Sequence, residues 1–146
     1  MGKKSSIDQL NSLLRGEMSA VETYQMALDK VDEIGPARDE LLVCLKSHED
    51  RVQMLSDAII ELGGEPAQGS GPWGVFAKTV EGGAKIFGDK ATIAALEEGE
   101  DHGLHDYEDE VEDDDLDIES RDLIMNQLLP MQRQTHERLS ALKGRL

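Results

Sequence analysis

The chain has 146 residues, a formal net charge of −16 and only 3% aromatic residues, which favours one all-α domain over a β-rich one. This excess of carboxylates argues against nucleic-acid binding, which needs clustered lysine and arginine, and against docking on an anionic membrane. No apolar run approaches transmembrane length, and the single cysteine, Cys44, cannot form an internal disulfide. We therefore expect one domain over residues 1–146 in a reducing cytoplasm.

The first two predicted helices each carry one polar residue on an otherwise apolar face. The first helix is predicted to start at Ser5 or Ser6, where Ser6 and Gln9 form a capping box, and Gly35-Pro36 ends that helix and starts the second. Along both helices, apolar residues recur at alternating steps of four and three, which is the spacing of a helical bundle. The polar exceptions on these faces are Glu17 in the first helix and His48 in the second.

A connector rich in glycine and proline follows the second helix over residues 63–74. Residues 75–87 are apolar enough for a short extra helix outside the bundle, so the whole crossover spans residues 63–88. Short loops make neighbouring helices antiparallel. A connection of this length instead predicts that the second and third helices run parallel.

The third helix is predicted to start at Asp89, a good N-cap. Its apolar face includes Glu100, with either Glu97 or Leu96 before it. An acidic run follows, in which ten of the fourteen residues from Asp106 to Glu119 are Asp or Glu. The spacing of this run does not fit an EF-hand, so we interpret it as a solvated helix end and loop.

The fourth helix, predicted from about residue 120 to 142, repeats features of the second. Its apolar face contains His136, and Pro130 should kink it or remove a hydrogen bond. His48 and His136 are both followed by glutamate, and the first and third helices share Gly-Glu, six residues and Tyr. These segments are Gly16-Glu17…Tyr24 and Gly99-Glu100…Tyr107. The repeat predicts a duplicated hairpin and a pseudo-twofold four-helix bundle, with tyrosine hydroxyls within reach of the glutamates.

Each predicted helix thus places one metal-capable side chain on the bundle seam. The four are Glu17, His48, Glu100 and His136. Carboxylate and neutral imidazole suit Fe, Mn or Zn. In di-iron bundles, two helices supply one Glu each and the other two supply a Glu-x-x-His pair each. Here Leu45 and Arg133 stand where those paired glutamates are expected, and Arg133 is able to form an ion pair with Glu17 or Glu100 instead.

The depth of these residues along the helices differs between the two hairpins. A tight turn places Glu100 close to the depth of His136, so we expect these two residues to meet. The same reasoning places Glu17 about five residues, or roughly 7 Å, from the depth of His48. These two meet only if the loop geometry differs. The substitutes that could enter a metal site are Glu22 and Glu97.

Three further stretches carry a family resemblance. They are Leu62-Gly63-Gly64-Glu65-Pro66 followed by Gly69-Ser70 and Trp73, Leu96-Glu97-Glu98-Gly99-Glu100-Asp101 with Tyr107, and Gln134-Thr135-His136-Glu137-Arg138-Leu139. With the two Gly-Glu…Tyr segments, they make the chain similar to the rubrerythrin and ferritin superfamily. More specifically, the chain resembles a bacterial ferritin-like family known only as a domain of unknown function and associated with stress responses. The resemblance implies a ferritin-like bundle and supplies no activity.

Two main functions follow from these patterns. A metal-associated bundle in iron or oxidative-stress handling would bind Fe, Mn or Zn through Glu17, Glu100 and His136, and as an enzyme it would be a ferroxidase or peroxidase. The alternative is a metal-free bundle acting in assembly or partner binding, motivated by the two replaced glutamates. A weaker third function is cation buffering by the acidic run. We expect a homo-oligomer, a dimer or larger, with His102 and His105 on the surface.

Overall fold

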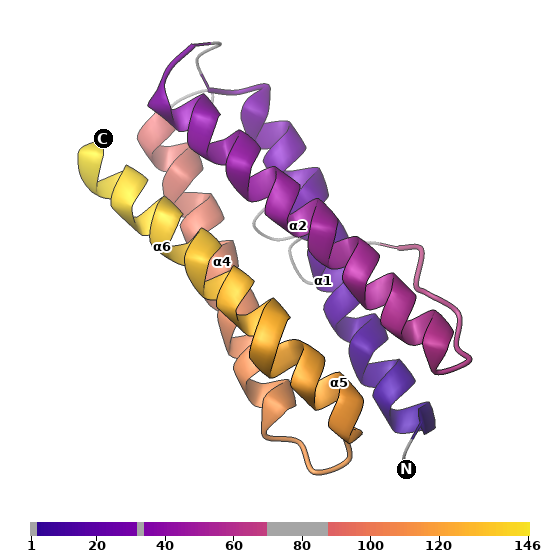
Figure 1. Ribbon diagram of the computed structural model, residues 1–146. Coiled ribbons are helices and arrows are strands. Elements are labelled where there is room, and N and C mark those ends of the chain that lie inside the picture. Colours follow the sequence, from indigo (N-terminus) through magenta and orange to yellow (C-terminus); the bar gives the residue numbers. More distant parts are fainter. Residues whose placement is uncertain (1–2, 32–33, 70–87) are drawn as a thin grey trace.

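The computed structural model describes residues 3–31, 34–69 and 88–146, and every regular element in these ranges is a helix. Three of the long helices are α1 (Lys3–Leu28), α2 (Pro36–Glu61) and α4 (Asp89–Val111). A fourth long helix completes the chain. Figure 1 shows two antiparallel pairs, α1 with α2 and α4 with the final helix, packed side by side. The expected all-α bundle is confirmed for this part of the chain.

The helices α2 and α4 run in the same direction, as the long connection between them predicts (Figure 1). The predicted extra helix at residues 75–87 lies outside the described residues, as does most of the predicted crossover, so both stay predictions. No helix within the described ranges is both long and apolar enough to cross a membrane.

The final helix contains one wide turn at its centre. Its three segments are α5 (Ile118–Leu123), the π-helical turn η1 (Ile124–Leu128) and α6 (Leu129–Arg145). The backbone keeps helical angles across both junctions, and the N–H of Leu129 bonds the carbonyl of Ile124, five residues back. Pro130, which has no N–H to donate, follows directly. The irregularity predicted at Pro130 is therefore a π-turn, and it leaves the consecutive residues Leu128 and Leu129 both buried.

Two helix starts differ from the sequence-based expectation. α1 begins at Lys3, so Ser6 lies inside the helix, where its buried hydroxyl accepts a hydrogen bond of 2.9 Å from the N–H of Asp117. The N-cap of α4 is Gly88, with a φ of 79° that favours glycine, and Asp89 is the first helical residue. Neither predicted side-chain cap is therefore formed.

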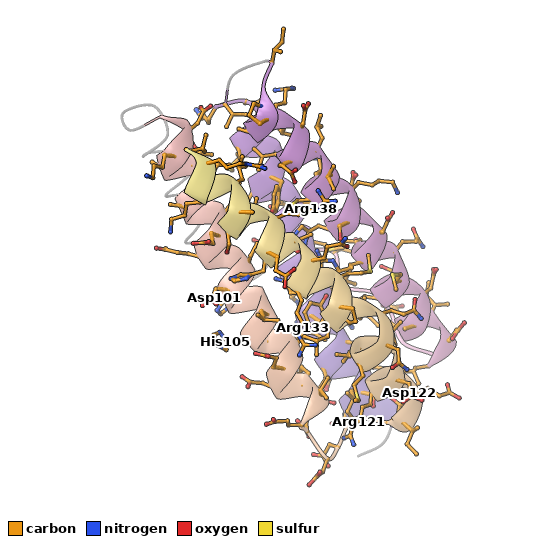
Figure 2. The ribbon with its side chains drawn as sticks, turned by 60° about the vertical axis from the view of Figure 1, so that its left-hand side comes forward. Asp101, His105, Arg121, Asp122, Arg133 and Arg138 are labelled. Carbon is orange, nitrogen blue, oxygen red and sulfur yellow. The ribbon has the colours of Figure 1, made fainter. Side chains whose placement is uncertain are left out.

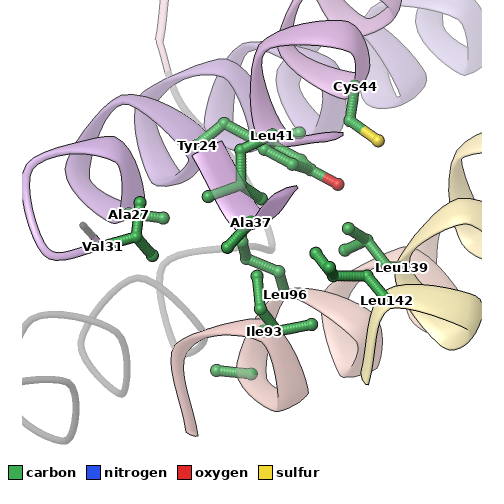
Figure 3. Packing of buried hydrophobic residues seen from close by; sticks show 12 residues of the cluster. Tyr24, Ala27, Val31, Ala37, Leu41, Cys44, Ile93, Leu96, Leu139 and Leu142 are labelled. Atoms are coloured by element: carbon green, nitrogen blue, oxygen red, sulfur yellow. The ribbon is translucent and has the colours of Figure 1, made fainter. Parts of the chain in front are cut away.

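The core consists of two apolar clusters, and each long helix contributes to both. One cluster, drawn in Figure 3, includes Tyr24, Ala27, Leu41, Cys44, Ile93, Leu96, Leu139 and Leu142. The other includes Leu10, Leu14, Leu55, Ile59, Tyr107, Ile124 and Leu128. In every long helix, the buried residues between these two sets are polar, apart from Gly99 in α4. A buried polar layer therefore crosses the middle of the bundle.

Candidate functional site

Eight buried side chains, two from each long helix, form one hydrogen-bonded network in this polar layer, and the two tyrosines of the set reach it from the neighbouring apolar clusters. The eight are Glu17 and Tyr24 from α1, His48 and Arg51 from α2, Glu100 and Tyr107 from α4, and Gln132 and Thr135 from α6. None is more than 4% exposed, so their polar atoms must find partners inside the protein. A set of buried polar groups on four helices is the first candidate for a functional site.

His48 connects the two glutamates of the layer. Its Nδ1 lies 2.6 Å from Oε2 of Glu17, and its Nε2 lies 2.7 Å from Oε2 of Glu100. An ionised carboxylate only accepts hydrogen bonds, so an imidazole between two carboxylates must donate from both nitrogens and carry a positive charge. Burial and the charge of Arg51 oppose this state. The two glutamates outweigh them, and the pKa of His48 is raised.

The contact between Glu17 and His48 corrects the predicted offset between these residues. α1 ends at Leu28 and α2 begins at Pro36, so the connection is centred near residue 32, earlier than a tight turn would place it. Glu17 lies 15 residues before this centre, and the residue 15 positions after it is Ser47, next to His48. The longer connection therefore removes the mismatch.

Arg51 brings a second positive charge into the layer, and it is fully buried. Its guanidinium has five N–H groups, and each has an acceptor. Nη1 donates to Oε1 of Glu17 at 3.3 Å and to Oε1 of Gln132. Nη2 donates to Oγ1 of Thr135 at 3.1 Å and to Oγ of Ser47 at 3.2 Å, and Nε donates to the carbonyl of Ser47 at 3.4 Å. The arginine is therefore satisfied within the protein.

The two tyrosines connect the hairpins crosswise. Tyr24 of α1 donates to Oε2 of Glu100 in α4 at 3.0 Å. Tyr107 of α4 donates to Oε1 of Glu17 in α1 at 2.8 Å. The predicted hydrogen bonds between tyrosines and glutamates are confirmed, and each tyrosine reaches the glutamate of the other repeat. This exchange ties the two copies of the sequence motif together.

The layer is electrically neutral as a whole. Burial alone would raise the pKa values of Glu17 and Glu100. The positive charges of Arg51 and His48 outweigh that effect, so both carboxyl pKa values are lowered. Two carboxylates are thus balanced by one guanidinium and one imidazolium.

The final helix presents Thr135 to the layer, whereas the predicted face presents His136. Thr135 donates to Oε1 of Glu100, and Gln132 donates to the same oxygen at 3.3 Å and to the carbonyl of Glu100 at 2.7 Å. From Gln132 the buried face takes a step of three residues where the prediction took four. The structure confirms that this part of the final helix lies at the depth of Glu100. The predicted inward face is wrong, because Thr135 points into the layer and the side chain of His136 is 26% exposed.

Two predicted substitute ligands also lie away from the layer. Glu22 is exposed on α1. Glu97 accepts hydrogen bonds from Oγ of Ser140 at 2.6 Å and from Nζ of Lys143 at 2.9 Å, near the surface. Of the six predicted metal ligands, the structure brings three together in the polar layer, namely Glu17, His48 and Glu100.

The arginine that pairs with Glu17 is Arg51, so the predicted pairing of Arg133 with a buried glutamate is wrong. Arg133 is 55% exposed and lies 3.9 Å from Glu108. The sequence contains a signal for Arg51. The buried residues of α2 alternate by steps of four and three through it, at Ala37, Leu41, Cys44, His48, Arg51 and Leu55. A search for apolar residues alone passes over this position.

A family model described as a domain of unknown function, DUF2383, matches residues 5–113. The chain belongs to this family. The match covers α1, α2 and α4, which supply six of the eight side chains of the layer, and ends before the final helix. No curated protein and no solved structure matches the chain.

The polar layer of this DUF2383 family member does not offer the free ligand atoms that a metal pair of the ferritin type needs. Both nitrogens of His48 contact carboxylates, and the carboxylates of Glu17 and Glu100 each accept at least three hydrogen bonds. Arg51 adds a fixed positive charge beside them. In the described part of the chain, no three His, Cys, Asp or Glu side chains are grouped to hold a metal ion. Metal binding by the three grouped residues stays a prediction, and the observed arrangement is a closed set of ion pairs.

An open pocket between α4 and α6 gathers other metal-capable side chains of the DUF2383 chain. They are Glu97, Glu98, Asp101, His102, His105 and His136. Asp101 lies between two of the histidines, with Oδ1 3.6 Å from Nε2 of His136 and Oδ2 3.7 Å from Nδ1 of His105. Figure 2 shows Asp101 and His105 at the outer edge of α4. The expected surface position of His105, which is 65% exposed, is confirmed.

Proposed function

We propose that this chain is a metal-free, ferritin-like bundle that acts as a structural or partner-binding protein. The observation that carries the proposal is the neutral polar layer, in which Arg51 and His48 already balance both buried glutamates. The duplicated hairpins, the parallel course of α2 and α4 and the crosswise tyrosine bonds support the ferritin-like part. The stress association of the family that the chain resembles belongs to the same proposal.

In this proposal, the polar layer specifies how the two hairpins pair. A buried ion pair adds little net stability over apolar packing, but losing one partner of such a pair costs about 3–5 kcal/mol. If one hairpin slid along the other by a helical turn, Glu100 would lose His48 and Tyr24 while remaining buried, and Glu17 would lose Tyr107. The layer therefore selects one alignment of the hairpins and disfavours the others.

The outer face of α2 supports the assembly part of the proposal. Two neighbouring apolar side chains, Leu42 and Val43, are 46% and 45% exposed. We propose that they contribute to a homodimer or larger oligomer, which the net charge of −16 opposes at low ionic strength. Light scattering on the purified chain should give a larger mass at high salt, and Leu42→Lys should prevent this. A monomer under all conditions would reject the assembly.

Metal analysis of the protein purified without chelators tests the metal-free core. We expect a metal content far below one ion per chain and no change in melting temperature on adding Fe(II), Mn(II) or Zn(II). A ligand at 100 times its Kd should stabilise the fold by about 2.7 kcal/mol, so binding to the core would be visible in the melt. Stoichiometric metal that disappears in Glu100→Gln would contradict the proposal.

A second candidate function is metal association at the open pocket on α4 and α6. It is favoured because carboxylates and imidazoles make up the whole lining of this pocket and Asp101 approaches two histidines. No three of these groups already converge, so a bound ion would require exposed side chains such as His105 to rotate. This candidate retains the role in iron or oxidative-stress handling, as a ferroxidase or peroxidase.

Iron oxidation in a plate assay tests this second function. We expect Asp101→Asn to lower any Fe(II) binding and oxidation, whereas the matched surface change Glu112→Gln should leave both unchanged. Asp101 is central to the pocket, and Glu112 is an exposed carboxylate outside it. Equal activity in the two variants, or none in the unaltered chain, would eliminate the pocket as an iron site.

A further inference from the structure

Three ligand-type groups meet in the polar layer without forming a metal site. Glu17, His48 and Glu100 come from three different helices, and the histidine contacts both carboxylates within 2.7 Å. Arg51 lies one helical turn after His48 and places its guanidinium beside the same groups, 3.3 Å from Glu17 and 3.4 Å from the Nε2 of His48. The position of this buried cation decides what the three groups do.

We infer that the guanidinium of Arg51 takes the place of a metal ion in the centre of the bundle, and that its removal uncovers a divalent-cation site. The ligands of this latent site are Glu17, His48 and Glu100. The inference rests on the proposed metal-free core. It goes further by naming the residue that keeps the core closed and the class of ion that the opened core takes up.

Charge balance supports this exchange. With Arg51 present, two carboxylates face two positive groups and the layer is neutral. Without the guanidinium, the layer keeps a net negative charge in a site where an unpaired charge is costly. A divalent cation beside a neutral His48 restores a neutral layer, because it replaces the charges of the guanidinium and the imidazolium together. Carboxylate oxygen and imidazole nitrogen suit Zn(II) or Mn(II).

The volume that the Arg51 side chain occupies also supports a latent cation site. Arg51 is among the largest fully buried side chains of the protein, so truncation to alanine leaves a polar cavity next to the glutamates. Two polar partners of the guanidinium, Gln132 and Thr135, remain to line this cavity. A polar cavity with several hydrogen-bonding groups admits water or an ion, whereas an apolar cavity stays dry.

Three substitutions of Arg51 separate charge from space. Arg51→Ala removes both the charge and the bulk. Arg51→Glu removes the charge and adds a carboxylate to the three existing ligands. Arg51→Met removes the charge but keeps an apolar side chain in the space, so it is the matched control. Calorimetric titration with ZnCl₂ and with MnCl₂, together with circular-dichroism melting with and without EDTA, measures binding and folding for each.

We expect no binding by the unaltered chain or by Arg51→Met. We expect Arg51→Ala to bind one ion per chain, at least about tenfold more tightly than any residual binding by the unaltered chain, and Arg51→Glu to bind more tightly again. Both should melt at a lower temperature in EDTA and recover on adding metal. Adding Glu100→Gln to Arg51→Ala should abolish the binding, which locates the ion in the layer.

If Arg51→Ala is unfolded in EDTA, refolding with Zn(II) or Mn(II) replaces the titration, and recovered helix content supports the inference. Failure to refold with either metal overturns it. A folded Arg51→Ala that binds neither metal, or that still binds after Glu100→Gln, also overturns it. These outcomes contradict the latent site alone. Stoichiometric core metal in the unaltered chain would instead contradict the proposed metal-free function.

Discussion

His48 and His136 begin the same dipeptide in the two halves of a duplicated sequence, yet they end in opposite environments. His48 is fully buried between two carboxylates, whereas the side chain of His136 is 26% exposed and lies 3.6 Å from Asp101. The first half supplies the layer with two cations, and the second supplies the neutral groups of Gln132 and Thr135. Because the layer holds only two carboxylates, two more buried cations would leave it positively charged. The repeat therefore keeps its helices and its buried glutamates but not its buried cations.

The largest predicted effect follows directly from this difference. His48→Ala leaves Glu17 and Glu100 buried with one positive partner fewer, so we expect a loss of about 3–5 kcal/mol in the free energy of unfolding. His136→Ala removes a partly exposed side chain from the surface, and we expect a change within about 0.5 kcal/mol. Urea denaturation of the two variants measures both values. Similar losses of stability in the two variants would mean that His48 and His136 do not lie in the different environments described.

The crosswise tyrosine bonds give the next largest effect. Tyr24→Phe and Tyr107→Phe each remove one hydroxyl that donates to a buried carboxylate, with little change in shape. We expect each to cost about 1.5–3 kcal/mol, which is the usual range for hydrogen bonds to charged groups. Denaturation curves should give similar losses for the two, because their contacts are related by the repeat. A loss confined to one variant would show that only one of the two tyrosine–glutamate bonds stabilises the fold.

Stability should also depend on pH through His48. Its pKa is raised from the usual value of 6.5, so its contribution is complete below that value and is lost as pH rises through the folded-state pKa. Each group of this kind changes stability by at most about 1.4 kcal/mol per pH unit. Melting temperatures from pH 6 to 9 should fall in the unaltered chain and in His136→Gln. In His48→Gln, an unchanged slope would argue against this assignment.

At acidic pH, the stability should change in the opposite direction, through Glu17 and Glu100. The pKa values of Glu17 and Glu100 are lowered from the usual 4.5, so their contribution is present above that value and is lost as pH falls through the folded-state values. The stabilising contributions of these three groups therefore overlap most completely between the two usual values, 4.5 and 6.5. Melting below pH 4 measures the loss, and it should be smaller in Glu17→Gln.

A smaller effect is expected at Gly103, on the side of the layer formed by the second hairpin. A Cβ there would lie 2.9 Å from Nε2 of Gln132, whose amide bonds both Arg51 and Glu100. Gly103→Ala should therefore cost about 1 kcal/mol, the value of a typical hydrogen bond. Gly144→Ala meets no atom within 4 Å and should be neutral or stabilising by about 0.5 kcal/mol. Equal melting temperatures for Gly103→Ala and the unaltered chain would mean that Gln132 can move aside without a loss of stability.

Much of the fold is predictable from the sequence because apolar spacing and turn residues act locally. The four long helices, the start of α2 at Pro36 and the repeat all follow from such patterns. The site is predictable only in part, since it depends on which face each helix turns inward. Arg51 is not predicted, because apolar spacing does not lead one to expect a charged residue on a buried face. Thr135 is not predicted because the wide turn at η1 and a step of three set the inward face. Pro130 marks an irregularity there, but it does not show which face the helix turns inward after it.

The protonation of His48 tests the central claim most directly. In protein labelled with ¹⁵N histidine and dialysed against EDTA, the account predicts that both ring nitrogens of His48 carry protons at pH 7. NMR should then show one-bond N–H couplings at both nitrogens, unchanged when Zn(II) or Mn(II) is added. A neutral ring with one bare nitrogen, or a His48 signal that shifts or broadens with stoichiometric metal, would contradict a metal-free, charge-balanced layer.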